Sequence, residues 1–233
     1  PPGDFRSNLH RGGTVTEAGS KLLEGRVPRK DATVLARASR DGLLCLGKTH
    51  MTELAFSGLG LNPNTATPPN ALDPDLAPGG SSSGAAVSVA LGLAAAAIAS
   101  DTGGSVRVPA AWNGLVGFKP THESLPEKGV VPLCRKFDTV GPIARTVEDC
   151  AELFAVMAAD KAADVANSVV HGRRLMVLDG VPFDEAEEGP VAAFEDAVER
   201  LARAGAQISR VSSDWVAKAM PLSAQLFAPE AYG

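Results

Sequence analysis

Apolar residues recur along this chain at the spacings that distinguish helices from strands. Residues 31–40 have apolar positions at helical intervals, Asp31 is a side chain suited to cap the first turn, and Asp41 and Gly42 end the segment. The leucine-rich residues 43–47 follow directly and predict a buried strand.

The C-terminal part of the chain repeats this order of helix and strand. Residues 190–204 form an amphipathic helical pattern that Gly205 ends, and residues 207–211 predict a strand, as do residues 174–178. Helices that alternate with strands predict an α/β fold, here one domain over residues 1–233 with a mixed β-sheet core covered by helices on both faces.

The middle of the chain holds two helical segments and one long loop. Thr146 and Asp149 resemble a capping box that opens a helix reaching about Ala158. The alanine-rich residues 85–99 predict a buried helix, which is too short to span a bilayer. Residues 62–78 contain five prolines and predict an irregular loop, and loops of this length in compact domains are usually functional or disordered.

The composition is that of an ordinary globular protein and excludes several classes. The chain has 233 residues, 45% hydrophobic and 21% charged, and its net charge of -5 argues against a dedicated nucleic-acid or anionic-membrane binder. Its three cysteines predict reduced, buried thiols in the cytoplasm. Neither the cysteines nor the four scattered histidines have metal-ligand spacing, so no metal ion or cofactor is expected.

Two glycine-serine segments flank the predicted helix 85–99. Residues 79–84 read GGSSSG and lead into the helix N-terminus, a position that favours negative charge, and residues 101–107 read DTGGSVR. Glycines in the second segment let backbone N–H groups approach a reacting carbonyl. Ser81 and Ser105 are 24 residues apart, enough for the chain to return, so they are candidates for a nucleophile and a proton-relaying neighbour.

These two segments resemble the amidase signature hydrolases, which cleave carboxamides with a serine, a serine in a cis peptide and a lysine. The similarity extends through residues 14–20, 31–32, 46–49, 78–84, 101–110, 114–121 and 138–142. It implies an α/β amidase signature fold that cleaves a small-molecule amide through a serine acyl-enzyme. It also implies assembly either as a homodimer or with a partner subunit.

The resemblance implies a role for each matching residue. Ser105 would be the nucleophile and Ser81 the bridging serine. Arg107 would shape the site or bind a carboxylate of the substrate, and Gly80 would contact the substrate. The oxyanion hole would consist of the backbone N–H groups of Thr102, Gly103, Gly104 and Ser105.

The sequence departs from the family pattern at the third catalytic position. Counting back from Thr14, the catalytic lysine falls on Arg6. A lysine can be desolvated into a neutral amine that accepts a proton, whereas a guanidinium stays charged and offers no acceptor. The resemblance therefore implies an impaired amidase, and it leaves open a non-catalytic homologue or an amidotransferase subunit that supplies ammonia. The family domain is also expected to be incomplete at both ends of this chain.

A second motif lies earlier in the chain. Residues 42–49 match the phosphate-loop pattern GxxxxGK[ST], but the residues between the glycines are apolar and predict a strand. Lys48 is therefore interpreted as a structural residue and as a remote candidate to replace the missing lysine.

Overall fold

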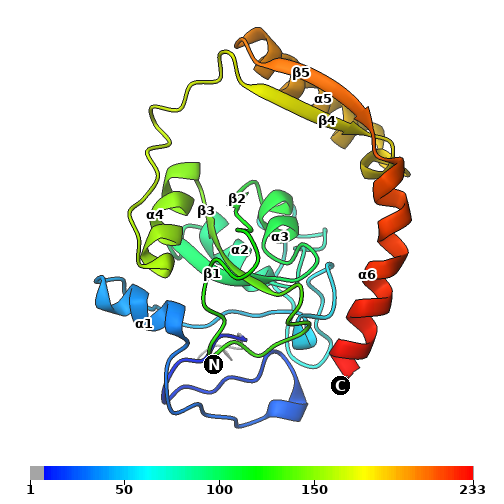
Figure 1. Ribbon diagram of the computed structural model, residues 1–233. Coiled ribbons are helices and arrows are strands. Elements are labelled where there is room, and N and C mark those ends of the chain that lie inside the picture. Colours follow the sequence, from blue (N-terminus) through cyan, green and yellow to red (C-terminus); the bar gives the residue numbers. More distant parts are fainter. Residues whose placement is uncertain (1–7, 233) are drawn as a thin grey trace. The chain divides into compact units, whose positions relative to one another are not determined.

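Figure 1 shows the computed structural model, which describes residues 8–232. The chain forms two compact units, Pro1–Val165 and Ala166–Gly233, which are described separately. The prediction of a single domain over residues 1–233 stays a prediction.

The first unit contains a three-stranded antiparallel sheet in the order β1-β3-β2, in which Ala96 lies opposite Ala144 and Asp101 opposite Thr139. Its elements are α1 (Thr33–Arg40), α2 (Ser83–Ala90), β1 (Ala96–Asp101), α3 (Arg107–Trp112), β2 (Val116–Gly117), β3 (Thr139–Ala144) and α4 (Val147–Ala158), with 3₁₀ turns at Lys21–Leu23 and Glu53–Ala55.

Helices cover both faces of this sheet, as the sequence predicted. Successive side chains of a strand point to opposite faces. Ile98 of β1 accordingly packs in a cluster with Met157 of α4, whereas the next residue, Ala99, packs in a second cluster with Ala86 of α2. The central position of β1 and β3 between these helices is visible in Figure 1.

The predicted helix 85–99 is only half correct. The helix α2 ends at Ala90, a turn follows in which Gly92 has a φ of +72°, and β1 begins at Ala96. Alanine-rich sequence favours a helix, but pairing with β3 outweighs that local preference. Ser81 and Ser105 are therefore separated by a helix and a strand rather than by one helix.

The N-terminal predictions fare unequally. The helix at residues 31–40 is confirmed as α1, but its N-cap is Ala32, and the Asp31 carboxylate instead accepts hydrogen bonds from Gly12 N (2.6 Å) and from Arg11 (2.7 Å). The buried strand at residues 43–47 is wrong, because the segment is irregular and Leu44 is 86% exposed. Apolar side chains alone do not make a strand, because a strand also needs a neighbouring strand with which to pair.

The α4 helix begins as predicted, since Thr146 caps it by accepting a hydrogen bond from Asp149 N at 3.0 Å. The cysteine prediction is correct for two residues only. Cys134 and Cys150 are buried and Cys45 is exposed, and all three are free thiols.

The second unit confirms the predicted C-terminal elements. It contains β4 (Arg174–Asp179) and β5 (Gln207–Ser212), which pair in parallel, with α5 (Glu188–Arg203), α6 (Asp214–Tyr232) and a 3₁₀ turn at Val181–Phe183. Arg210 of β5 forms ion pairs with Asp179 of β4 and Glu195 of α5. The α/β class is therefore confirmed, with antiparallel pairing in the first unit and parallel pairing in the second.

Among residues 8–232, no helix combines the length and apolar character needed to cross a membrane.

Candidate active site

The loop that carries Ser81 lies against an earlier part of the chain. The peptide bond between Gly80 and Ser81 is cis, which confirms the geometry that the resemblance implied. Gly80 N donates to Gly58 O at 2.7 Å, and Ser81 O accepts a hydrogen bond from Thr52 N at 3.0 Å. The Ser81 side chain is fully buried, and its hydroxyl has no hydrogen-bond partner among the described residues.

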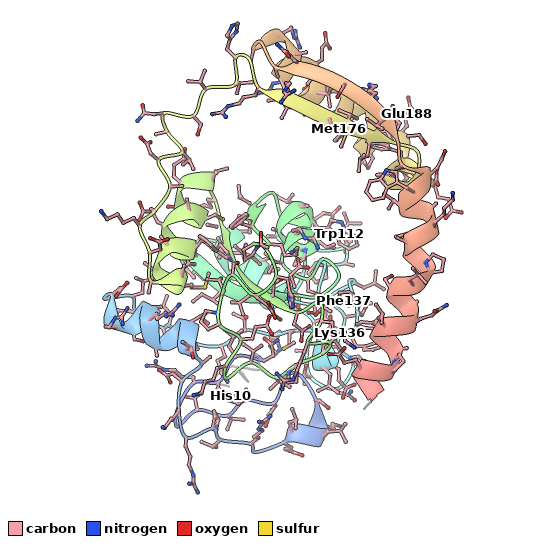
Figure 2. The ribbon with its side chains drawn as sticks, in the orientation of Figure 1. His10, Trp112, Lys136, Phe137, Met176 and Glu188 are labelled. Atoms are coloured by element: carbon pink, nitrogen blue, oxygen red, sulfur yellow. The ribbon has the colours of Figure 1, made fainter. Side chains whose placement is uncertain are left out.

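Glycine is required in this loop because another backbone segment packs directly on it. A Cβ atom on Gly80 would lie 2.5 Å from Gly60 N, and one on Gly60 would lie 2.3 Å from Gly79 O. A ring atom of Trp112, which is labelled in Figure 2, would lie 3.2 Å from a Cβ on Gly79. The close packing fixes the path of the chain into Ser81. The substrate-binding role implied for Gly80 stays a prediction.

The loop that carries Ser105 is organised by a buried carboxylate at the end of β1. Asp101 is 0% exposed. Its Oδ1 accepts a hydrogen bond from Gly104 N (2.8 Å), and its Oδ2 accepts one from Val106 N (3.0 Å). These bonds fold residues 101–106 around the carboxylate, so that Asp101 shapes the turn from which Ser105 projects.

The Arg107 guanidinium completes this arrangement. Its Nε and Nη2 atoms donate to the two carboxylate oxygens of Asp101 at 3.0 and 2.9 Å. Burial alone would raise the pKa of Asp101, but the hydrogen bonds from Arg107, Val106 and Gly104 outweigh it and lower that pKa. The Arg107 side chain is half exposed. Its substrate-binding role stays a prediction, and its observed contact is to Asp101.

A hydrogen bond between backbone atoms joins the two serine loops. Ser82 N donates to Ser105 O at 3.3 Å, and the Ser82 hydroxyl donates to Ser100 O at 3.4 Å. The hydroxyl groups of Ser81 and Ser105 form no hydrogen bond with each other in this structure, and their close approach stays a prediction.

The oxyanion-hole role implied for residues 102–105 stays a prediction, and their backbone N–H groups differ in the structure. Gly104 N already donates to Asp101, because the buried carboxylate would otherwise lose one of its donors. Among the described residues, the N–H groups of Thr102, Gly103 and Ser105 have no hydrogen-bond acceptor and remain available for an oxyanion.

A second buried carboxylate supports the loop from outside. Asp138, which directly precedes β3, accepts hydrogen bonds from Leu133 N (2.9 Å), from Cys134 N (3.1 Å) and from the Thr102 hydroxyl. Sequence reasoning assigned no role to Asp101 or Asp138. The available signal for Asp101 was an acidic residue directly after an apolar run, six positions before an arginine.

Arg6, the residue at the expected lysine position, lies outside the described residues. The nearby Asn8 is described: its Nδ2 donates to the Ser100 hydroxyl at 2.7 Å, and its carbonyl accepts from Val131 N at 2.9 Å. These bonds attach the start of the described chain to β1, beside the serine loops.

Lys48 has the contacts of a structural residue. It is 5% exposed, and its ammonium donates to Val15 O at 2.8 Å and to the Thr16 hydroxyl. Burial lowers the pKa of Lys48 to about 8, against the opposing influence of Cys45 and Glu17. Among the described residues, no hydrogen bond joins Lys48 to Ser81 or Ser105. Within residues 8–232, no group of three histidine, cysteine or acidic side chains is placed to hold a metal ion.

Comparison with known proteins places the chain in a family. The family profile described as Amidase matches residues 5–233. A 2-amino-5-chloromuconic acid deaminase of Comamonas testosteroni is 44% identical over 76% of this chain and 39% of its own length. A glutamyl-tRNA(Gln) amidotransferase subunit of Carboxydothermus hydrogenoformans is 35% identical over 95% of this chain and 48% of its own length.

Solved structures give the same result. The corresponding glutamyl-tRNA(Gln) amidotransferase subunit of Thermotoga maritima superimposes with a TM-score of 0.88 at 31% identity, covering 98% of this chain and 53% of that one. A peptide amidase of Stenotrophomonas maltophilia gives 0.76 at 31% identity, with 89% and 47% covered. The chain thus spans about half the length, or less, of the relatives it matches. On this profile match, these identities and this fold, the chain belongs to the amidase signature family.

Proposed function

We propose that this chain carries the nucleophile of an amidase that cleaves a carboxamide C–N bond through an acyl-enzyme on Ser105. The observation that carries the proposal is the hydrogen bond from Ser82 N to Ser105 O, because it brings together two serine loops that are 24 residues apart in sequence. The buried hydroxyl of Ser81, which has no hydrogen-bond partner among the described residues, supports it. Such a group lowers the stability of the fold, so its presence calls for a functional explanation.

In this mechanism the Ser105 hydroxyl attacks the amide carbonyl carbon, and its proton passes to the Ser81 hydroxyl. The developing oxyanion accepts hydrogen bonds from the N–H groups of Thr102, Gly103 and Ser105. The C–N bond then breaks as the leaving nitrogen takes a proton from Ser81. Water attacks the ester on Ser105, which releases the acid and restores both serines.

Ser81 must itself exchange its proton with a further group in this scheme. The family places a lysine there, and this sequence has Arg6, whose guanidinium offers no acceptor. Loss of a general base typically costs about 10²- to 10⁴-fold, so slow amide hydrolysis is the expected activity.

Labelling with a serine-directed phosphonate tests the nucleophile directly, because the reagent needs the oxyanion donors but no leaving amine. Mass spectrometry of the labelled chain should place the adduct on Ser105, and Ser105→Ala should abolish it. Ser88→Ala is the matched control, since the Ser88 hydroxyl lies on α2 and, within the described part of the chain, donates to Ala85 O. An unlabelled chain, or a label at another serine, would favour the non-catalytic alternative.

A second candidate function is the ammonia-supplying subunit of an amidotransferase, acting in the cytoplasm with a partner subunit. The similarity to the Carboxydothermus and Thermotoga subunits favours it, since these two alignments cover 95% and 98% of this chain. Hydrolysis of free amides that rises on addition of a partner subunit would distinguish this function from a self-sufficient amidase.

A further inference from the structure

A small cavity lies directly beside the candidate oxyanion loop. Its lining includes Asn8, Thr102, Glu127, Arg135 and Asp138, and its free space is about the size of one water molecule. Thr102 connects it to the site, because that residue supplies one of the N–H groups available to an oxyanion. Figure 2 labels Lys136 and Phe137 in the segment that follows Arg135 and leads to Asp138.

Among the described residues, the two acidic side chains that line this cavity differ in their hydrogen bonds. The Asp138 carboxylate is occupied by Leu133 N, Cys134 N and the Thr102 hydroxyl. The Oε1 atom of Glu127 is buried and has no hydrogen-bond partner among the described residues. A buried carboxylate oxygen is acceptor-only, so the complementary ligand must bring an N–H or O–H donor.

The charges around Glu127 favour a cationic donor over a neutral one. Burial raises the pKa of Glu127, and the charge of Asp138 raises it further. His122 Nδ1 lies 4.0 Å from Glu127 Oε1, but it is 2.9 Å from Asp138 O and bonds there. Arg135 is exposed to solvent, which screens its charge. A water molecule would satisfy the hydrogen bond of Glu127 Oε1 but would bring no positive charge to the two neighbouring carboxylates.

We propose that this cavity is a substrate subsite that takes a primary ammonium group, held by the Glu127 carboxylate. The small volume excludes a ring or a quaternary ammonium. The preferred substrates are then carboxamides with an amino group at the far end of a short chain. This inference rests on the proposed amidase function, because the link between the cavity and the reacting carbonyl is Thr102, which lines the cavity and carries a candidate oxyanion donor.

Matched pairs of amides test the subsite. Each ω-amino carboxamide is compared with the alkanamide in which a methyl group replaces the ammonium, over spacers of increasing length. Binding to the 233-residue chain is measured by ligand-detected NMR, and ammonia release is measured separately. One spacer length should bind about 10- to 100-fold more tightly than its methyl counterpart, the usual worth of a charge-assisted hydrogen bond.

Variants assign the preference to one carboxylate. Glu127→Gln keeps the shape and should remove the preference, whereas Glu123→Gln, at an exposed position nearby, should keep it. Arg135→Gln should leave or strengthen it, because a competing positive charge is removed. Thermal unfolding of each variant verifies that the fold is retained, and Arg135→Gln keeps the proposal testable if Glu127→Gln does not fold.

The outcomes separate the subsite from the activity. A preference that is absent at every spacer length, or that survives in Glu127→Gln, overturns the subsite and indicates a cavity filled by water only. Ammonia release without any preference supports the amidase function and overturns the subsite. A Glu127-dependent binding preference without ammonia release supports the subsite and counts against catalysis.

Discussion

Replacing Asp101 with asparagine should destabilise the first unit and disable the nucleophile loop together. Asparagine keeps one acceptor oxygen but turns an N–H₂ group toward donors. In place of Oδ1, that group leaves Gly104 N and Arg107 Nη2 without their acceptor, and in place of Oδ2 it does the same to Val106 N and Arg107 Nε. Breaking a buried ion pair costs about 3–5 kcal/mol. Because the Arg107 side chain is half exposed and can be rehydrated, about 2–3 kcal/mol is expected here.

Urea unfolding measures the first effect, and the rate of phosphonate labelling at Ser105 measures the second. Asp41→Asn is the control, since the ion pair of Asp41 with Arg40 is on the surface and should be worth less than about 0.5 kcal/mol. An Asp101→Asn protein with unchanged stability and an unchanged labelling rate would refute the assigned role.

The pH dependence of this variant follows from the lowered pKa of Asp101. A carboxyl group with a depressed folded-state pKa contributes stability above its unfolded pKa of about 4, and that contribution is lost as the pH falls through the folded value. The stability difference between wild type and Asp101→Asn should therefore be largest near neutral pH and should shrink below about pH 4.

Three further changes test other parts of the argument. In the wild-type protein the free energy of unfolding should rise between about pH 8 and 10, because the pKa of Lys48 is lowered to about 8 and the unfolded chain binds the lysine proton more tightly. Lys48→Met should remove this rise. Urea unfolding of both proteins across this pH range measures the difference. Gly60→Ala should cost about 1–3 kcal/mol more than Gly25→Ala in thermal unfolding, since both glycines have positive φ but only at Gly60 would the new Cβ meet a backbone oxygen, at 2.3 Å. Arg6→Lys should raise amide turnover by up to about 10²- to 10⁴-fold if Ser81 passes its proton to this side chain. Equal turnover of the two proteins would show that another group is the base.

Local signals predicted the C-terminal elements and the α4 cap well. Thr146 caps α4 through a hydrogen bond that spans three residues, and the amphipathic pattern of residues 190–204 needs only its own sequence to be recognised. The helix prediction was wrong for residues 96–99, because these residues form a strand by pairing with β3, which lies more than 40 residues later in the sequence. The strand prediction around Leu44, which is exposed, was wrong for the converse reason: the segment is apolar but forms no strand pairing in the described part of the chain.

The candidate site divides in the same way. Ser81 and Ser105 stand in short glycine-serine motifs, so the sequence alone could single them out. The environment of Glu127 could not be predicted, because the burial of its Oε1 atom and the nearby charge of Asp138, which raises its pKa, arise only once the chain has folded. Asp101 lies between these cases. Its motif is visible in the sequence, but its hydrogen bonds to the loop can be recognised only in the folded structure.

The interactions that shape the nucleophile loop are independent of the residue at position 6. Asp101 orients Gly104, Val106 and Arg107, and all of these contacts lie within seven consecutive residues. If position 6 supplies the proton acceptor, as proposed, an arginine there removes that acceptor and leaves these contacts within residues 101–107 in place. Phosphonate labelling also requires the Ser105 proton to leave, but its good leaving group needs no proton, whereas amide cleavage needs a proton delivered to a poor leaving group. Labelling should therefore be slowed less than amide turnover. Labelling at Ser105 and amide turnover therefore measure different parts of the site. From the intact contacts of Asp101 and the arginine at position 6, we expect a chain that is labelled at Ser105 but hydrolyses amides slowly.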